Sequence, residues 1–155
     1  MDTKSRTELL QKYRTGHEAM VEALTDLRDD ELDRSAIAGE WTPRQIVHHV
    51  ADSEMTAAVR LRKLIAEDDA QIQGYDEKQY ADALTRDRPI QPSLEAVRWA
   101  RESTLQILER LDEKEWMKAG THSELGPYSV EKWLEVYAAH CHDHAAQIKQ
   151  SRGIA

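Results

Sequence analysis

Apolar side chains recur at steps of three and four residues through four long segments of the chain, the spacing of a helix with one buried face. The four segments are approximately 3–27, 43–67, 93–111 and 129–150. Thr42, Ser93 and Ser129 stand at the start of the last three segments, where a hydroxyl can cap a helix N-terminus, and Pro43 suits a first helical position. The pattern predicts four long amphipathic helices.

The stretches between these helices are polar and irregular. Residues 28–40 are acidic and read as a connection with one short turn at 29–32, whereas residues 75–85 are expected to form a short helix capped by Asp76. Residues 113–128 are expected to be a long connection. Alternating β-branched runs are absent, so the pattern indicates an all-α protein, a four-helix bundle with an extra short helix in its crossover. The length of 155 residues suits a single domain over 1–155.

Charge narrows the choice of partners. Lys and Arg number 21 against 29 Asp and Glu, which gives a net charge of −8 and argues against nucleic acid or an anionic membrane as partner. The first residues lack the apolar core of a signal peptide, and no run approaches the roughly 20 apolar residues of a membrane span. Cys141 is the only cysteine, so no intrachain disulfide can form, and a small packing role is expected for it. A cytoplasmic protein is expected.

Three of the seven histidines lie between Tyr137 and Gln147. His140 and His144 are four residues apart, so on a helix they share one face, and that face is otherwise apolar. His142 lies about 200° around the helix from His140 and is expected to point away. Two imidazoles on a buried face need polar partners, and a shared metal ion is favoured over bonds to the backbone or to Tyr137.

A third inward histidine is expected on the helix that follows Pro43. His49 lies between Ile46 and Val50 on the inner face, whereas His48 falls about 100° away and is expected outside. His49, His140 and His144 would give three nitrogen donors, which suit zinc, nickel, copper or ferrous iron and leave a coordination position free.

The sequence says less about the residues that surround these three histidines. Asp143 and Gln147 are candidates for orienting the imidazoles. No His-Glu-x-x-His and no paired Glu-x-x-His motif is present, which disfavours a zincin-type protease and a di-iron bundle. Asp52, Glu54 and His122 are weak candidates for a general acid, with His122 expected in a loop, and the catalytic residues stay unknown.

Three stretches resemble the DinB/YfiT-like family of metal-dependent enzymes: Trp41 to Ser53, Gly126 to Trp133, and Tyr137 to Ile148. Arg60 and the segment Tyr75-Asp-Glu-Lys are similar to its YfiT-type branch. The resemblance implies an antiparallel four-helix bundle, often a homodimer, with zinc or nickel on the three matching histidines: His49, His140 and His144. Members of the family are hydrolases or transferases of low-molecular-weight thiols.

Two classes of function remain open. The first is an enzyme whose metal ion activates a water or a low-molecular-weight thiol against a small-molecule substrate, with Arg60 facing an anionic part of the thiol. The alternative is a non-catalytic stress-response bundle that binds a metal or another ligand.

Overall fold

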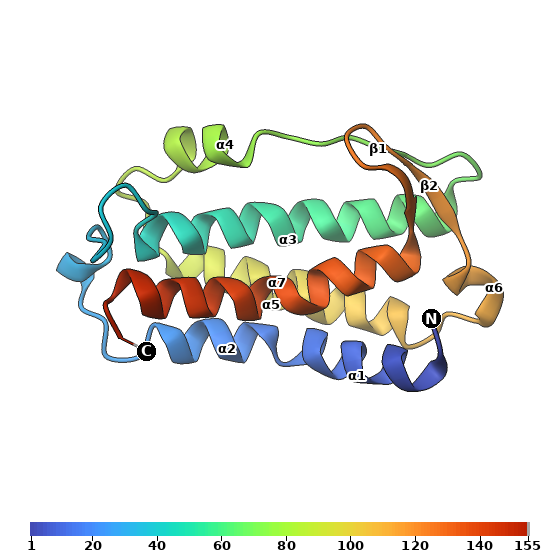
Figure 1. Ribbon diagram of the computed structural model, residues 1–155, viewed down its shortest axis with the longest axis horizontal. Coiled ribbons are helices and arrows are strands. Elements are labelled where there is room, and N and C mark those ends of the chain that lie inside the picture. Colours follow the sequence, from blue (N-terminus) through green and yellow to red (C-terminus); the bar gives the residue numbers. More distant parts are fainter. Residues whose placement is uncertain (155) are drawn as a thin grey trace.

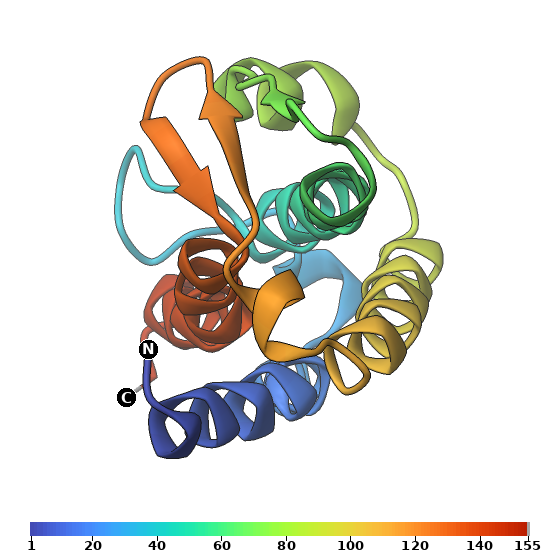
Figure 2. The same ribbon diagram turned by 90° about the vertical axis from the view of Figure 1, so that its right-hand side faces the viewer.

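Four long helical segments pack side by side in the computed structural model, which describes residues 1–154 (Figures 1 and 2). They are α1 (Thr3–Arg14) continued by α2 (Gly16–Ala23), then α3 (Pro43–Ala66), α5 (Gln91–Leu108) and α7 (Val130–Ser151). In Figure 1, α3 and α5 run in one direction, and α1, α2 and α7 run in the other. The predicted four-helix bundle is confirmed. Within residues 1–154, no helix combines the length and the apolar character needed to cross a membrane.

The helix ends follow from their capping residues. Thr42 and Gln45 form a reciprocal capping box at the start of α3, with Pro43 in the first turn. The hydroxyl of Ser129 accepts a hydrogen bond from the Lys132 amide at 3.0 Å and begins α7. The short helix α4 (Glu77–Leu84) begins after Asp76, as its sequence indicates, and η1 (Asp29–Glu31) supplies the expected turn.

Several predicted helix boundaries are wrong. The first helical segment ends at Ala23 and not near Leu27, and α5 ends at Leu108 and not near Leu111. Ser93 does not cap α5, because this helix already begins at Gln91 and the Ser93 side chain is buried inside the bundle. The first predicted helix is interrupted at Thr15, between α1 and α2. The side chain of Arg101 fills this break, and its Nη2 donates to the Tyr13 carbonyl oxygen at 2.6 Å.

A small sheet covers one end of the bundle, so the prediction of a wholly α-helical protein is incomplete. Strand β1 (Gln71–Ile72) pairs in parallel with β2 (Ala119–His122), which pairs antiparallel with β3 (Gly126–Ser129). The short helix α6 (Glu113–Trp116) precedes β2 and crosses the end of the bundle in Figure 2. These elements replace the expected loop over 113–128.

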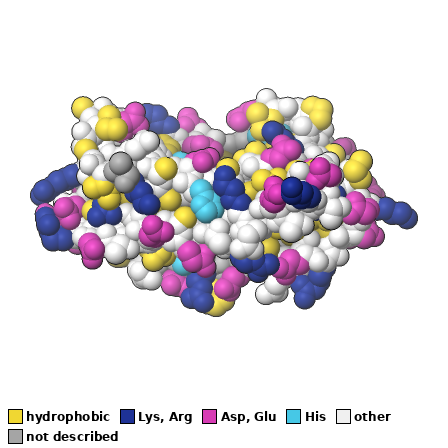
Figure 3. All heavy atoms as spheres, turned by 60° about the horizontal axis from the view of Figure 1, so that its bottom comes forward, with side chains coloured by type: hydrophobic (Ala, Val, Ile, Leu, Met, Phe, Trp, Pro, Cys, Tyr) yellow, Lys and Arg dark blue, Asp and Glu magenta, His cyan; other side chains and the backbone are white. Residues whose placement is uncertain are grey.

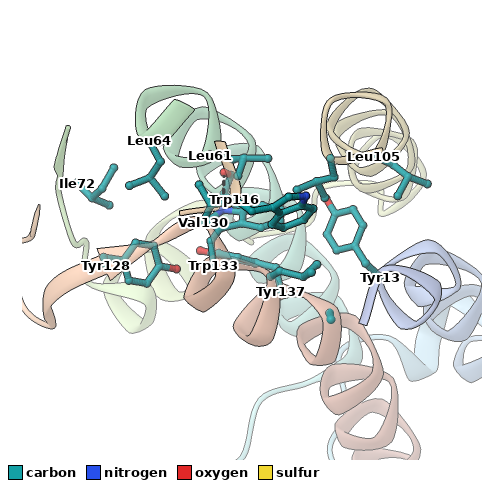
Figure 4. Packing of buried hydrophobic residues seen from close by; sticks show 14 of the residues in the cluster. Tyr13, Leu61, Leu64, Ile72, Leu105, Trp116, Tyr128, Val130, Trp133 and Tyr137 are labelled. Atoms are coloured by element: carbon teal, nitrogen blue, oxygen red, sulfur yellow. Dashed lines mark hydrogen bonds between the residues drawn. The ribbon is translucent and has the colours of Figure 1, made fainter. Parts of the chain in front are cut away.

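The buried apolar residues among 1–154 form two clusters. The cluster at the sheet end is rich in aromatic rings, and Trp133 donates from its indole Nε1 to the Ala57 carbonyl oxygen at 2.9 Å (Figure 4). The cluster at the other end is mainly aliphatic and includes Ile46, Val50 and Ile148. Between the two clusters along α3 and α5 lie Glu54 and Arg101, both buried. A polar layer therefore divides the core, and it lies next to the histidines described below.

Candidate metal centre

The structure brings His49, His140 and His144 together, as their helical positions predict. His49 comes from α3 and is 2 % exposed, whereas His140 and His144 come from α7 and are partly exposed. One nitrogen of each ring lies within 4.8 Å of a nitrogen of the other two. Figure 3 shows one face of the molecule, on which acidic and basic side chains are interspersed with apolar ones.

The spacing of two of these nitrogens suits a shared ion. The Nε2 atoms of His49 and His144 are 3.2 Å apart. Two nitrogens at about 2.0–2.1 Å from a tetrahedral zinc ion would be separated by roughly 3.3 Å. The pair therefore already has the separation that a common metal ion requires.

Hydrogen bonds orient the two histidines of α7. The Nδ1 of His144 lies 2.7 Å from the Gln147 side-chain oxygen, so Nδ1–H donates and the Nε2 lone pair is left to face His49. The Nδ1 of His140 lies 3.3 Å from Oε1 of Glu54, which leaves its Nε2 free in the same way. The structure thus places Gln147 beside its imidazole, whereas Asp143 is exposed and makes no hydrogen bond to the imidazoles among the described residues.

The third ring is held by packing. The indole of Trp41 lies 4.8 Å from the His49 ring between centroids, and the His49 Nδ1 is buried without a hydrogen-bond partner among residues 1–154. Burial lowers the pKa of His49 to about 3 and that of His144 to about 4. Both imidazoles are therefore neutral near pH 7, which is the form that binds a metal ion.

A second group, Glu54, His140 and Cys141, also has closely spaced donor atoms. Here the position of a cation is taken by Arg101, whose Nη1 lies 2.6 Å from Glu54 Oε1 and 3.2 Å from Cys141 Sγ. Burial acts to raise the pKa of Glu54, but the charge of Arg101 and the bond from His140 lower it overall, so the carboxylate is ionised. This group is an ion pair that accepts further hydrogen bonds, and the three histidines are the better candidate for a metal site.

His48 is a correction to the sequence-based prediction. It is 1 % exposed, not outside, and its Nδ1 accepts from the Ser93 hydroxyl at 2.8 Å while its Nε2 donates to the Arg88 carbonyl oxygen at 3.2 Å. The segment that precedes α5 covers this side of α3. His48 therefore holds the crossover in place and is directed away from the other histidines.

The remaining histidines of the prediction are also placed. His142 points away from the cluster and its Nε2 donates to the Lys12 carbonyl oxygen at 2.9 Å, beside the break between α1 and α2. His122 is buried in β2 and packs on Tyr128, so the expected loop position is wrong. Asp52 is partly buried, and burial raises the pKa of its carboxyl group.

Arg60 is separated from the histidine cluster by the side chain of Tyr137. Its Nη1 donates to the Tyr137 hydroxyl at 3.0 Å, its Nη2 donates to the Gln73 carbonyl oxygen at 2.7 Å, and its Nε is buried without a partner among residues 1–154. The Tyr137 ring in turn packs against the His140 ring at 5.7 Å between centroids. A cavity of about 430 Å³ adjoins Arg60 between α3 and β1, with Val59 and Ile72 in its lining.

Comparison with known proteins gives the family. The DinB superfamily matches residues 12–148. A protein of Oceanobacillus iheyensis named "Putative metal-dependent hydrolase" is 36 % identical over 123 residues, which cover 79 % of this chain and 72 % of that protein. A Bacillus cereus protein of the same name is 29 % identical over 133 residues, covering 86 % and 77 %.

Solved structures share the fold. YfiT from Bacillus subtilis, described as a probable metal-dependent hydrolase with an unusual four-helix bundle topology, superposes with a TM-score of 0.90 at 23 % identity, covering 100 % of this chain and 91 % of that one. The mycothiol-dependent maleylpyruvate isomerase superposes with a TM-score of 0.70 at 15 % identity, covering 96 % and 63 %. On the match over residues 12–148 and the identity to its relatives, this chain belongs to the DinB superfamily.

Proposed function

We propose that this protein is a metal-dependent hydrolase that holds one divalent ion, zinc or nickel, on His49, His140 and His144. The observation that carries the proposal is the convergence of three imidazole nitrogens within 4.8 Å, two of them 3.2 Å apart. The names of its relatives support metal-dependent hydrolysis as the class of reaction.

The residues around the site suit this chemistry. A divalent ion on three protein ligands supplies a Lewis acid with a free coordination position, which can lower the pKa of a water or polarise a carbonyl group. Gln147 holds the His144 ring, and the partial exposure of His140 and His144 leaves one side of the cluster open to a small substrate. On the opposite side, the indole of Trp41 packs against the His49 ring, which is buried.

Transfer of a low-molecular-weight thiol is a second candidate, and the position of Arg60 favours it. The Arg60 guanidinium is separated from the cluster by Tyr137 and lines the cavity between α3 and β1, where it can meet an anionic part of a bound thiol. The fold shared with a mycothiol-dependent isomerase is consistent with such a use of the scaffold.

Untagged protein loaded with zinc or nickel tests both candidates. It should hydrolyse chromogenic ester or amide substrates, or accelerate attack of a common thiol on a chromogenic electrophile, and lose this activity on chelation and in His140→Ala. His142→Ala is the matched control on the same helix and should retain the activity. A protein that binds the ion through the three histidines yet accelerates neither reaction would support the non-catalytic bundle instead.

A further inference from the structure

A buried ion pair stands directly behind the candidate metal ligand His140. Glu54 of α3 and Arg101 of α5 have side chains that are 0 % and 4 % exposed, and Oε1 of Glu54 lies 2.6 Å from Nη1 of Arg101. The same Oε1 lies 3.3 Å from Nδ1 of His140. We infer that Glu54, held by Arg101, is a positioning residue that fixes the His140 ring with its Nε2 lone pair directed into the metal site; this inference rests on the proposed function.

Arg101 is itself fixed from two further helices. Its Nε and Nη2 donate to the Tyr13 carbonyl oxygen of α1, at 3.1 and 2.6 Å, and Nη1 and Nη2 lie 3.3 Å from the Tyr137 carbonyl oxygen of α7. The guanidinium also lies over the Tyr13 ring, 3.8 Å from its centroid. Four helices therefore fix the position of one carboxylate oxygen, and that oxygen contacts the histidine.

Stability alone does not account for this pair. Two buried charges lose their hydration, and well-packed apolar residues of similar size commonly replace such a pair with no loss of stability. Glu54 also keeps Oε2 buried without a hydrogen-bond partner among the described residues, so its bonding is concentrated on the oxygen that contacts His140. A carboxylate that accepts the other N–H of a metal-binding histidine orients the ring and raises its basicity.

The test replaces both charges, so that no unpaired ion is left in the core. In Glu54→Leu/Arg101→Met, His140 loses its acceptor while all three ligands remain. In Glu54→Gln/Arg101→Met, an amide oxygen remains to accept from Nδ1–H. The matched control is Arg6→Met/Glu131→Leu, which removes another ion pair, 3.3 Å apart, in which Arg6 is buried and Glu131 is partly exposed. Glu131 lies nine residues before His140 on α7, or about 13 Å along the helix.

Two measurements are made on each protein. The first is zinc affinity by competition with a chromophoric chelator, with unfolding curves to verify that each variant is folded. The Leu/Met variant should bind zinc about 10- to 100-fold more weakly than wild type, as expected for loss of a ligand's hydrogen-bond partner. The Gln/Met variant should recover part of this loss, and the Arg6/Glu131 control should bind as wild type does. Wild-type affinity in a folded Leu/Met variant would overturn the inference.

The second measurement needs no metal. Long-range proton–nitrogen NMR of the metal-free protein reports which nitrogen of His140 carries the proton. Wild type should show Nδ1–H, and the Leu/Met variant should lose this preference. A wild-type His140 protonated at Nε2 would contradict the positioning role. If wild type binds no ion but shows Nδ1–H that depends on Glu54, the proposed function fails while the contact between Glu54 and His140 stands.

Discussion

Replacing His48 by alanine should destabilise the protein without emptying the metal site. His48 makes two buried hydrogen bonds, to Ser93 and to the Arg88 carbonyl oxygen. Arg88 keeps a second donor, because Nη1 of Arg44 lies 2.8 Å from the same oxygen. The hydroxyl of Ser93 is instead left buried with its partner removed.

The magnitude follows from these contacts. Each lost hydrogen bond costs about 0.5–1.5 kcal/mol net, and an unsatisfied buried hydroxyl adds to this, so a loss of roughly 2–4 kcal/mol of unfolding free energy is expected. The matched control is His142→Ala. It removes one donor, Nε2, which lies 2.9 Å from the Lys12 carbonyl oxygen and 3.4 Å from the Thr15 hydroxyl at a partly exposed side chain, and it should cost about 0.5–1.5 kcal/mol.

Urea unfolding of the metal-free proteins, followed by circular dichroism, measures both changes. Elemental analysis of the loaded proteins should show wild-type metal content in each. An unfolding free energy of His48→Ala no lower than that of His142→Ala would refute the reasoning, since His48 would then not hold the crossover. Loss of the ion in a His48→Ala protein of wild-type stability would refute it too.

Three further predictions concern the core, pH and self-association. A Cβ at Gly16 would lie 2.7 Å from Arg101 Nη2 and 2.9 Å from Cys141 Cβ. Gly16→Ala should therefore lower the unfolding free energy by about 1–3 kcal/mol, measured by urea titration. Helix propensity alone favours alanine, so a gain in stability would contradict the prediction. The pKa values of His49 and His144 in the folded protein lie near 3 and 4, below the ordinary value of about 6.5. Below pH 6.5 the unfolded chain therefore binds more protons than the folded protein does, and the unfolding free energy falls as the pH drops. His49 alone should lower the unfolding free energy of metal-free protein by roughly 2 kcal/mol between pH 7 and pH 5, and equal urea midpoints at the two pH values would contradict this. We expect the protein to form a homodimer, with a light-scattering mass near twice 17.8 kDa at micromolar concentration. The mass of a single chain would count against this prediction.

The histidine cluster could be predicted from sequence because helical phase alone places His49, His140 and His144 inward. The same reasoning failed for His48, since phase cannot show that the segment before α5 covers a second face of α3. Dividing a helix into an inner and an outer face works only where one side meets solvent.

The break at Thr15 and the polar layer escaped prediction for a related reason. No proline marks the break; its cause is the guanidinium of Arg101, far along the chain, which packs on Gly16. An arginine in a helical pattern normally lies outside, and only the structure shows Arg101 and Glu54 paired in the core. The strands are two to four residues long, too short to display an alternating pattern.

Metal content per chain tests the central proposal most directly. Untagged wild type and five single histidine-to-alanine variants, at positions 48, 49, 140, 142 and 144, are dialysed against a weak chelator and analysed for metal. Wild type, His48→Ala and His142→Ala should each hold close to one divalent ion per chain, whereas His49→Ala, His140→Ala and His144→Ala should lose most of it. Equal occupancy in all six proteins, or loss in His142→Ala with retention in His140→Ala, would contradict the assignment of the site.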